Sequence, residues 1–160
     1  ATCWDVRGTT YTNRYQDTHI WLAKYIAQNV NNADAGFDAN LNYNNNLRVY
    51  RFSETLLNAA ELTFDKDKTA ALGYFNQVHT RAGLPAMTSI TLDDIIKERR
   101  LEFVGEGKRY WDLVRTGKAA SALVPDTYGY RTNTWTEKKK YIPISQSELD
   151  SDPNLVQNDY

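Results

Sequence analysis

Apolar positions between residues 47 and 122 recur at helical spacing, whereas those on either side do not. In "LRVYRFSETLLNAAELTF" one side of a helix collects Val49, Phe52, Leu56, Ala59, Ala60 and Phe64. In "DKDKTAALGYFNQVHTRAG" the same spacing places Ala71, Phe75, Val78 and Ala82 together, and Gly83 is a typical helix end. The short connection at residues 65–68 predicts that the two helices form an antiparallel hairpin.

A third helix is predicted from Thr91 to about Gly105. Thr91 and Asp94, three residues apart, form a capping-box-like start. Gly105 and Gly107 bracket a break, after which "KRYWDLVRTG" predicts a fourth helix that Gly117 ends.

The flanking segments lack this periodicity. Residues 1–46 predict an irregular segment whose first part is extended, in which "HIWLAKYIAQN" is a candidate short helix. Residues 123–160 predict a loop followed by an extended piece, "YIPISQSEL". With residues 47–122 as a helical scaffold and no alternation of strands and helices, the chain is expected to be mainly α.

Composition excludes several classes of function. A net charge of -1 over 160 residues provides no field for nucleic acid or acidic membranes. One cysteine, Cys3, excludes an internal disulfide framework, and His19 and His79 lie outside any metal-ligand pattern, so no metal is expected. There is no phosphate-binding Gly-rich loop or nucleophile elbow, and no cofactor is expected.

The stretch "KERRLEFVGEGKRYWDLVRTGKA" mixes charges with apolar residues. On a helical projection, Arg99 falls inside the apolar face, Glu102 and Glu106 lie on its shoulder, and Glu98 lies further round. A guanidinium in an apolar face must be paired. The favoured interpretation is therefore a structural ion-pair network of Arg99, Glu102, Glu106, Arg109 and Arg115.

Two other interpretations of these charges are weaker. Glu98, Glu102 and Glu106 could be catalytic carboxylates, but a catalytic acid needs an apolar pocket without nearby cations. The arginines could instead bind an anion, although the adjacent glutamates would cancel much of their charge.

Four ordered motifs resemble the SusD/RagB family. "IIKERRLEFVGEGKRYWDLVRTG" is similar to its C-terminal signature, and "RVYRFSETLLNAAE" to its Arg-Tyr-Ala-Glu-x-Leu-Leu helix, with Phe52 and Ser53 where Tyr and Ala are usual. "FNQVHTRAGL" resembles the Ile-Asn-x-Val-Arg-x-Arg-Ala-Gly element, with His79 at the first Arg position. "YIPISQSELDSDPNLVQNDY" is similar to the family's ending, so that the resemblance covers about residues 50–160.

The resemblance implies a specific biology. SusD-like proteins are non-catalytic lipoproteins on the outer membrane of Bacteroidota, which bind glycans at the cell surface and deliver them to a SusC-type TonB-dependent transporter. Their fold combines tetratricopeptide-type helix pairs with long irregular loops. Family members are several times longer, so residues 1–160 are expected to be the C-terminal part of a SusD-like domain that contacts the remainder of its own chain. The lipid anchor would lie in that N-terminal remainder, and Cys3 would not carry it.

Aromatic residues in polar loops are the candidate sugar contacts, because a ring binds the C–H face of a sugar while polar groups bind its hydroxyls. The preferred loop is "TYGYRTNTW", which offers Tyr128, Tyr130, Arg131, Asn133 and Trp135, and the second is "FDANLNYNNN", which contains Tyr43. Trp21 and Trp111 are expected in the core, and Trp135 has the alternative of packing under its loop. An alternative function is a helical scaffold that contacts the transporter, with the sugar contacts made outside this chain.

Overall fold

The computed structural model describes residues 3–5, 19–22, 24, 47–125, 127, 132 and 134–160. The chain divides into two compact units, Ala1–Arg109 and Tyr110–Tyr160. The expectation of a mainly helical fold is confirmed.

The first unit begins with a short antiparallel hairpin. Strand β1 (Cys3–Asp5) pairs with β2 (Ile20–Leu22), and Trp4 lies opposite Trp21. The candidate helix over "HIWLAKYIAQN" is therefore wrong at residues 20–22. Ile and Trp favour strands when a partner strand is available, and that partner comes from 15 or more residues earlier in the sequence.

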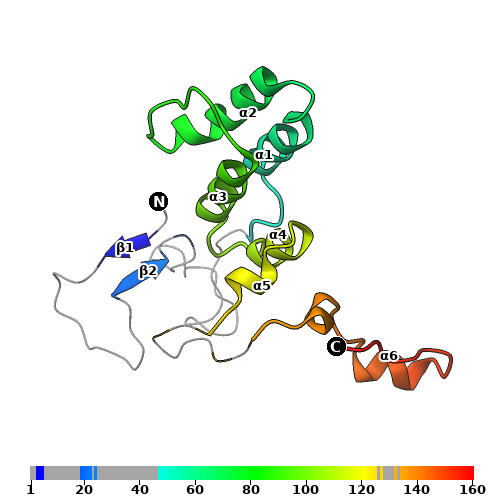
Figure 1. Cartoon of the computed structure of the whole chain (residues 1–160). Helices are drawn as coiled ribbons and strands as arrows, with labels where there is room; N and C mark the ends of the chain where they lie inside the picture. The colour runs from blue at the N-terminus through cyan, green and yellow to red at the C-terminus, as the bar shows by residue number, and fades with distance from the viewer. Residues whose placement is uncertain are drawn as a thin grey trace. The chain divides into compact units, whose positions relative to one another are not determined.

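Three packed helices follow among the described residues of the first unit (Figure 1). Helix α1 (Phe52–Thr63) packs against α2 (Lys68–Arg81) and α3 (Leu92–Glu102). The Thr91 side chain accepts from the Asp94 backbone N–H and the Asp94 carboxylate accepts from the Thr91 backbone, so the predicted capping box is confirmed. Asp67 caps α2 by accepting from the backbone N–H of Ala70.

The core of this unit lies where α1, α2 and α3 meet. It consists of Leu56, Leu57, Ala60, Phe75, Val78, Ile95 and Phe103. The predicted apolar face of α1 is wrong at its N-terminal end, because the side chains of Val49 and Phe52 are 72% and 71% exposed. Val49 precedes the helix, so helical spacing does not apply to it, and Leu57 occupies the centre of the contact.

The second unit has shorter elements and few buried side chains. Helix α4 (Arg109–Arg115) begins at the unit boundary and is followed by α5 (Ala119–Ala122), the 3₁₀ helix η3 (Glu137–Lys140) and α6 (Gln146–Ser151). The extended piece expected at "YIPISQSEL" is wrong at its end, because Ser145 caps α6 by accepting from the Glu148 backbone N–H. Among its described residues, the buried apolar side chains are Leu113 and Ala119.

Two tryptophans expected in the core are not buried there. Trp111 is 48% exposed and Trp21 is 36% exposed. Trp111 follows the helical spacing of α4, but α4 has only 7 residues and turns Leu113 inward instead. Periodicity over so short a helix does not determine which side of it is covered.

Candidate functional site

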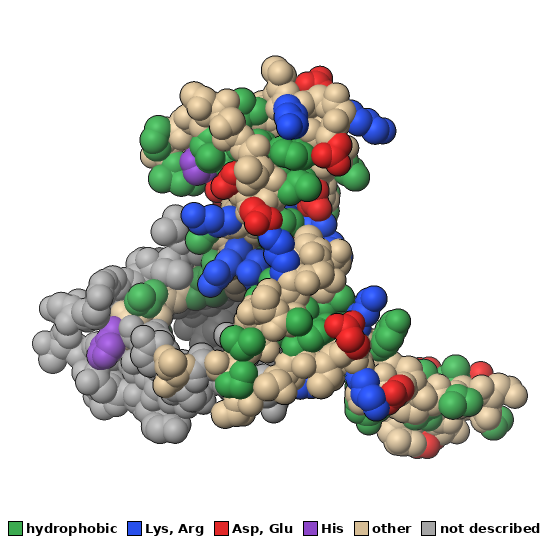
Figure 2. Space-filling view, in the orientation of Figure 1, with side chains coloured by type: hydrophobic (Ala, Val, Ile, Leu, Met, Phe, Trp, Pro, Cys, Tyr) green, Lys and Arg blue, Asp and Glu red, His purple; other side chains and the backbone are tan. Residues whose placement is uncertain are grey.

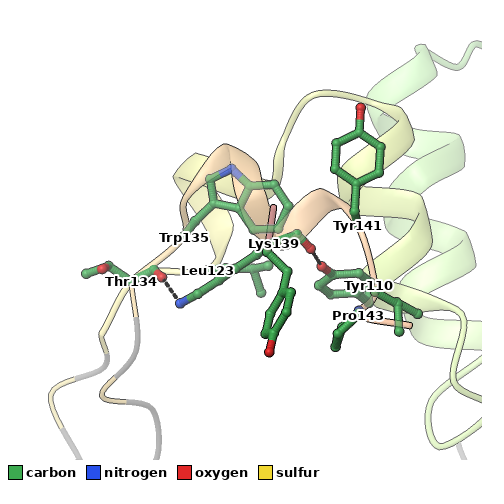
Figure 3. Close-up of a pocket in the computed structure, with 9 residues that line it drawn as sticks. Tyr110, Leu123, Thr134, Trp135, Lys139, Tyr141 and Pro143 are labelled. Atoms are coloured by element: carbon green, nitrogen blue, oxygen red, sulfur yellow. Dashed lines mark hydrogen bonds between the residues drawn. The ribbon is translucent and has the colours of Figure 1, made fainter. Parts of the chain in front are cut away.

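A cavity of about 560 Å³ lies in the second unit around Trp135 (Figure 3). Most of its lining side chains are aromatic or aliphatic. They come from α4, the end of α5, the η3 region and the C-terminal segment. The lining residues are Tyr110, Leu123, Thr134, Trp135, Lys139, Tyr141, Ile142, Pro143 and Tyr160. An aromatic cavity with a few polar groups is a common form of small-ligand site.

Two rings define one side of this cavity. The centroids of Tyr110 and Trp135 lie 6.1 Å apart with an angle of 57° between the rings. The Trp135 indole Nε1 donates to the Glu137 carboxylate over 3.2 Å, which fixes the orientation of the indole. Trp135 is partly buried, so it has both a packed edge and surface for a ligand.

Backbone contacts hold the cavity walls together. The Tyr110 hydroxyl donates to the backbone carbonyl of Lys139, and the Lys139 ammonium donates to the backbone carbonyl of Thr134 (Figure 3). Lys139 therefore connects η3 to the segment at Thr134 through its side chain and to α4 through its carbonyl.

The C-terminal segment is attached to the same walls. The Gln157 side-chain amide accepts from the backbone N–H of Ile144 and donates to the carbonyl of Ile144, each over 2.9 Å. Lys138 and Asp159 form an ion pair of 2.6 Å. These contacts place Tyr160 at the cavity, a residue that the sequence analysis did not include. Tyr160 ends the motif "YIPISQSELDSDPNLVQNDY", but nothing in that motif indicates that its ring lies against the Trp135 loop.

Trp135 is the one candidate sugar contact whose position the structure describes. Tyr128, Tyr130, Arg131, Asn133 and Tyr43 lie outside the described residues. The cavity residues that the sequence analysis missed include Thr134, which lies inside the loop, Tyr110 from α4, and Tyr141, which follows η3.

The charged cluster in the first unit is organised around Arg51. Arg51 donates from Nη1 to Glu102 over 2.7 Å, and from Nε and Nη2 to the two carboxylate oxygens of Glu106 over 3.0 and 2.8 Å. Arg81 reaches Glu102 over 2.5 Å, and Lys24 forms an ion pair with Glu106. Arg51 was not among the predicted network residues, although its place in an apolar stretch just before a helix was a usable signal.

The predicted network cations have these partners. The guanidinium of Arg99 is buried, as expected, donates to Asn58 over 2.6 Å, and lies 3.7 Å from the Glu54 carboxylate. It also lies over the ring of Phe103, 5.3 Å from the centroid. Arg115 pairs with Asp112 on its own helix over 2.8 Å. Arg109 begins that helix.

Glu98 is buried, in contrast to its predicted position away from the apolar face of the helix. It was expected further round from the apolar face, but it is 6% exposed and 3.0 Å from Nδ1 of His79. His79 in turn stacks on Phe75, with ring centroids 5.2 Å apart. The neighbouring α2 covers this side of α3, which the projection of a single helix cannot show.

The carboxylates of the charged stretch do not have the surroundings of a catalytic acid. Glu98, Glu102 and Glu106 each contact a cationic or histidine side chain. Burial lowers the pKa of Lys24, and the nearby Arg51 and Arg48 lower it further. Among the described residues, no group of three or more His, Cys, Asp and Glu side chains is placed to hold a metal ion.

No helix in the described part of the chain is long and apolar enough to cross a membrane.

Comparison with solved structures gives close matches along almost the whole chain. Surface glycan-binding protein A from Bacteroides uniformis is 58% identical, with a TM-score of 0.84 over 98% of this chain and 36% of that one. Surface glycan-binding protein A from Bacteroides thetaiotaomicron, solved in complex with laminarihexaose, is 56% identical. Its TM-score is 0.86, and the match covers 100% of this chain and 37% of that one.

A curated relative and a family model agree with these matches. The SusD-like protein P38 from Formosa agariphila is 32% identical over 127 residues, which are 71% of this chain and 24% of that protein. In these three matches the chain covers between 24% and 37% of the relative's length. The model of the SusD family matches residues 2–160. Together with the helical fold, these matches show that the chain belongs to the SusD family.

Proposed function

We propose that this chain is part of a non-catalytic glycan-binding protein at the cell surface and that its ligand is a glucan of the laminarin type. The observation that carries the proposal is the match of the whole chain to surface glycan-binding protein A from B. thetaiotaomicron, whose structure contains laminarihexaose. The two chains are 56% identical, with a TM-score of 0.86.

The cavity around Trp135 supports a contribution of this chain to binding. A glucose ring presents axial C–H groups that pack on an indole, and its hydroxyls require polar partners at the edge. Trp135 and Tyr110 supply the rings, and Lys139 and Thr134 supply polar groups. In the proposal, the loop residues Tyr128, Tyr130, Arg131 and Asn133, and Tyr43 from the earlier polar loop, extend this surface.

The wider role follows from the family. The protein would capture the glucan outside the cell and pass it to a SusC-type TonB-dependent transporter in the outer membrane. A lipid anchor in a part of the protein outside this chain would hold it at the surface. The absence of a catalytic acid environment at Glu98, Glu102 and Glu106 agrees with capture without hydrolysis.

A second candidate function is a scaffold that contacts other protein surfaces. It is favoured by large apolar side chains on the outside of the first unit. Phe52 is 71% exposed and Leu62 is 79% exposed. Under this alternative the sugar contacts are made elsewhere in the complete protein.

The two functions are separated by substituting Trp135 in the complete gene product. Trp135→Ala is expected to reduce retention by laminarin in affinity gel electrophoresis, because stacking on an indole is lost. Phe52→Ala is the matched control, since Phe52 is exposed and does not line the cavity. Unchanged retention in Trp135→Ala would remove this cavity from the binding site, and release of reducing ends from laminarin would contradict the non-catalytic role.

A further inference from the structure

A second hollow lies in the first unit, and the described side chains that line it are mainly cationic. Its volume is about 470 Å³, and its lining residues are Lys24, Arg48, Arg51, Arg81, Ala82, Leu101 and Glu102. Figure 2 shows Lys and Arg side chains gathering beside α3, with Asp and Glu among them. From this lining we propose that the hollow binds an oxyanion of the carboxylate or sulfate type. The neutral glucan proposed above carries no such group, so this would be a separate ligand.

The two carboxylates beside this hollow, Glu102 and Glu106, already form ion pairs. Glu106 is 1% exposed and accepts from Arg51 and Lys24, and Glu102 is 9% exposed and accepts from Arg51 and Arg81. Among the described residues, these ion pairs join two carboxylates to three cationic side chains, Arg51, Arg81 and Lys24. The two glutamates orient Arg51 and carry one charge fewer than the three cations paired with them.

Arg81 is the side chain best placed to receive an anion. It lies in the last turn of α2, and its side chain is 60% exposed although Nη2 reaches Glu102. A guanidinium has five N–H donors in a planar fork. One contact with Glu102 therefore leaves donors available for a second acceptor that binds through two oxygens. Arg81 thus has both a fixed position and access to solvent.

The electrostatic surroundings agree with this geometry. The pKa of Lys24 is lowered first by burial and then by the positive charges of Arg51 and Arg48, although Glu102 acts in the opposite direction. The cations of the hollow therefore repel one another, and a bound anion would relieve that repulsion. Ala82 and Leu101 add apolar surface on which the carbon part of an organic acid can lie.

The experiment is calorimetric titration of the complete gene product at low ionic strength with sodium glucuronate, sodium sulfate and glucose. Glucuronate and sulfate should bind, glucose should not bind in this hollow, and added NaCl should weaken the binding of both anions. Laminarin affinity is measured in parallel, because loss of laminarin binding would concern the Trp135 cavity and not this site.

Substitutions in the lining test whether the anions bind in this hollow. Arg81→Gln should weaken anion binding about tenfold, because a charged hydrogen bond is lost. Arg48→Gln should also weaken it. Arg81→Lys, which keeps the charge but not the fork, should fall between Arg81→Gln and the native protein. Arg100→Gln is the control, because Arg100 is exposed on α3 and is not among the lining residues.

The outcomes are distinct. Tighter binding of glucuronate than of sulfate supports a sugar-borne anion, and equal binding of the two supports a site for free oxyanions. Absence of heat with both anions, or equal affinity in Arg81→Gln and the native protein, overturns the proposal.

Discussion

Arg51 donates to both carboxylate oxygens of Glu106, Nε to Oε2 over 3.0 Å and Nη2 to Oε1 over 2.8 Å, across 55 residues of sequence. The same guanidinium also donates to the side chain and the backbone carbonyl of Glu102. One side chain at the start of α1 thereby fixes the end of α3 and the turn that follows it. A two-point contact of this kind sets both distance and angle.

Replacing Arg51 should destabilise the first unit strongly. Arg51→Met would leave the nearly buried carboxylates of Glu102 and Glu106 without their main cation, at a cost of about 3 kcal/mol. Arg51→Lys should recover only part of this, because an ammonium cannot make the paired contacts. Hydrogen exchange of α1 and α3 amides in the complete protein measures the loss. Protection equal to that of an Arg100→Met control would contradict the role given to Arg51.

The contact between His79 and Glu98 should also matter for stability. Glu98 is 6% exposed, and His79 Nδ1 lies 3.0 Å from its carboxylate. His79→Ala would remove this partner and the stacking on Phe75, with an expected cost of about 2 kcal/mol. A shift in thermal denaturation, compared with Thr80→Ala on the exposed side of α2, checks this. A melting temperature as high as that of Thr80→Ala would show that Glu98 does not depend on His79.

The capping box of α3 predicts a pH dependence. Hydrogen bonds from the Thr91 hydroxyl and backbone N–H lower the pKa of Asp94 below the usual value of an aspartate. The ionised carboxylate therefore stabilises the folded state above the unfolded pKa of about 3.9, and this stabilisation is lost as the pH falls through the lower, folded pKa.

The matching experiment compares Asp94→Ala with the native protein. The variant should be less stable by about 1 kcal/mol at neutral pH, and the difference should shrink below about pH 4. Asp93→Ala is the control, since Asp93 is adjacent but is not part of the capping box. A difference that stays constant down to pH 2 would contradict the assigned role of the charge.

The connection between α2 and α3 depends on Asn76. Its amide donates to the carbonyl of Met87 and its carbonyl accepts from the Met87 N–H, each over 2.9 Å. Asn76→Ala should cost about 2 kcal/mol and increase amide exchange around Met87, and Asn76→Asp, which keeps one acceptor, should be intermediate. Gln77→Ala, on the exposed side of α2, is the control, and exchange at Met87 that matches this control would contradict the prediction.

Local signals predicted the helices well. The spacing of Ala71, Phe75 and Val78, the Thr91–Asp94 cap and the glycines after α2, α3 and α4 act over one or two turns, so the sequence alone displays them. Gly83, Gly105, Gly107 and Gly117 all have positive φ, at 85°, 77°, 72° and 69°, which explains why each ends or interrupts a helix.

Features that depend on contacts between distant parts of the chain could not be predicted from the sequence in the same way. Three features depend on what another segment of the chain covers or leaves open. They are the exposure of Phe52 and Trp111, the strand at residues 20–22, and the position of Tyr160 at the Trp135 cavity. The family was recognisable because four motifs occur in order, and that order does not require knowledge of contacts.

The sequence by itself determined the helical class, the caps, the family and the need for arginine–glutamate pairing, because each of these follows from residues that are close in the chain or from motif order. Only the tertiary structure decided which side chain meets which carboxylate, with Arg51 at Glu102 and Glu106 and His79 at Glu98. The physical reason is that these partners are 19 to 55 residues apart in sequence. Their pairing is selected by the packing of α1, α2 and α3 and not by the preferences of any one helix.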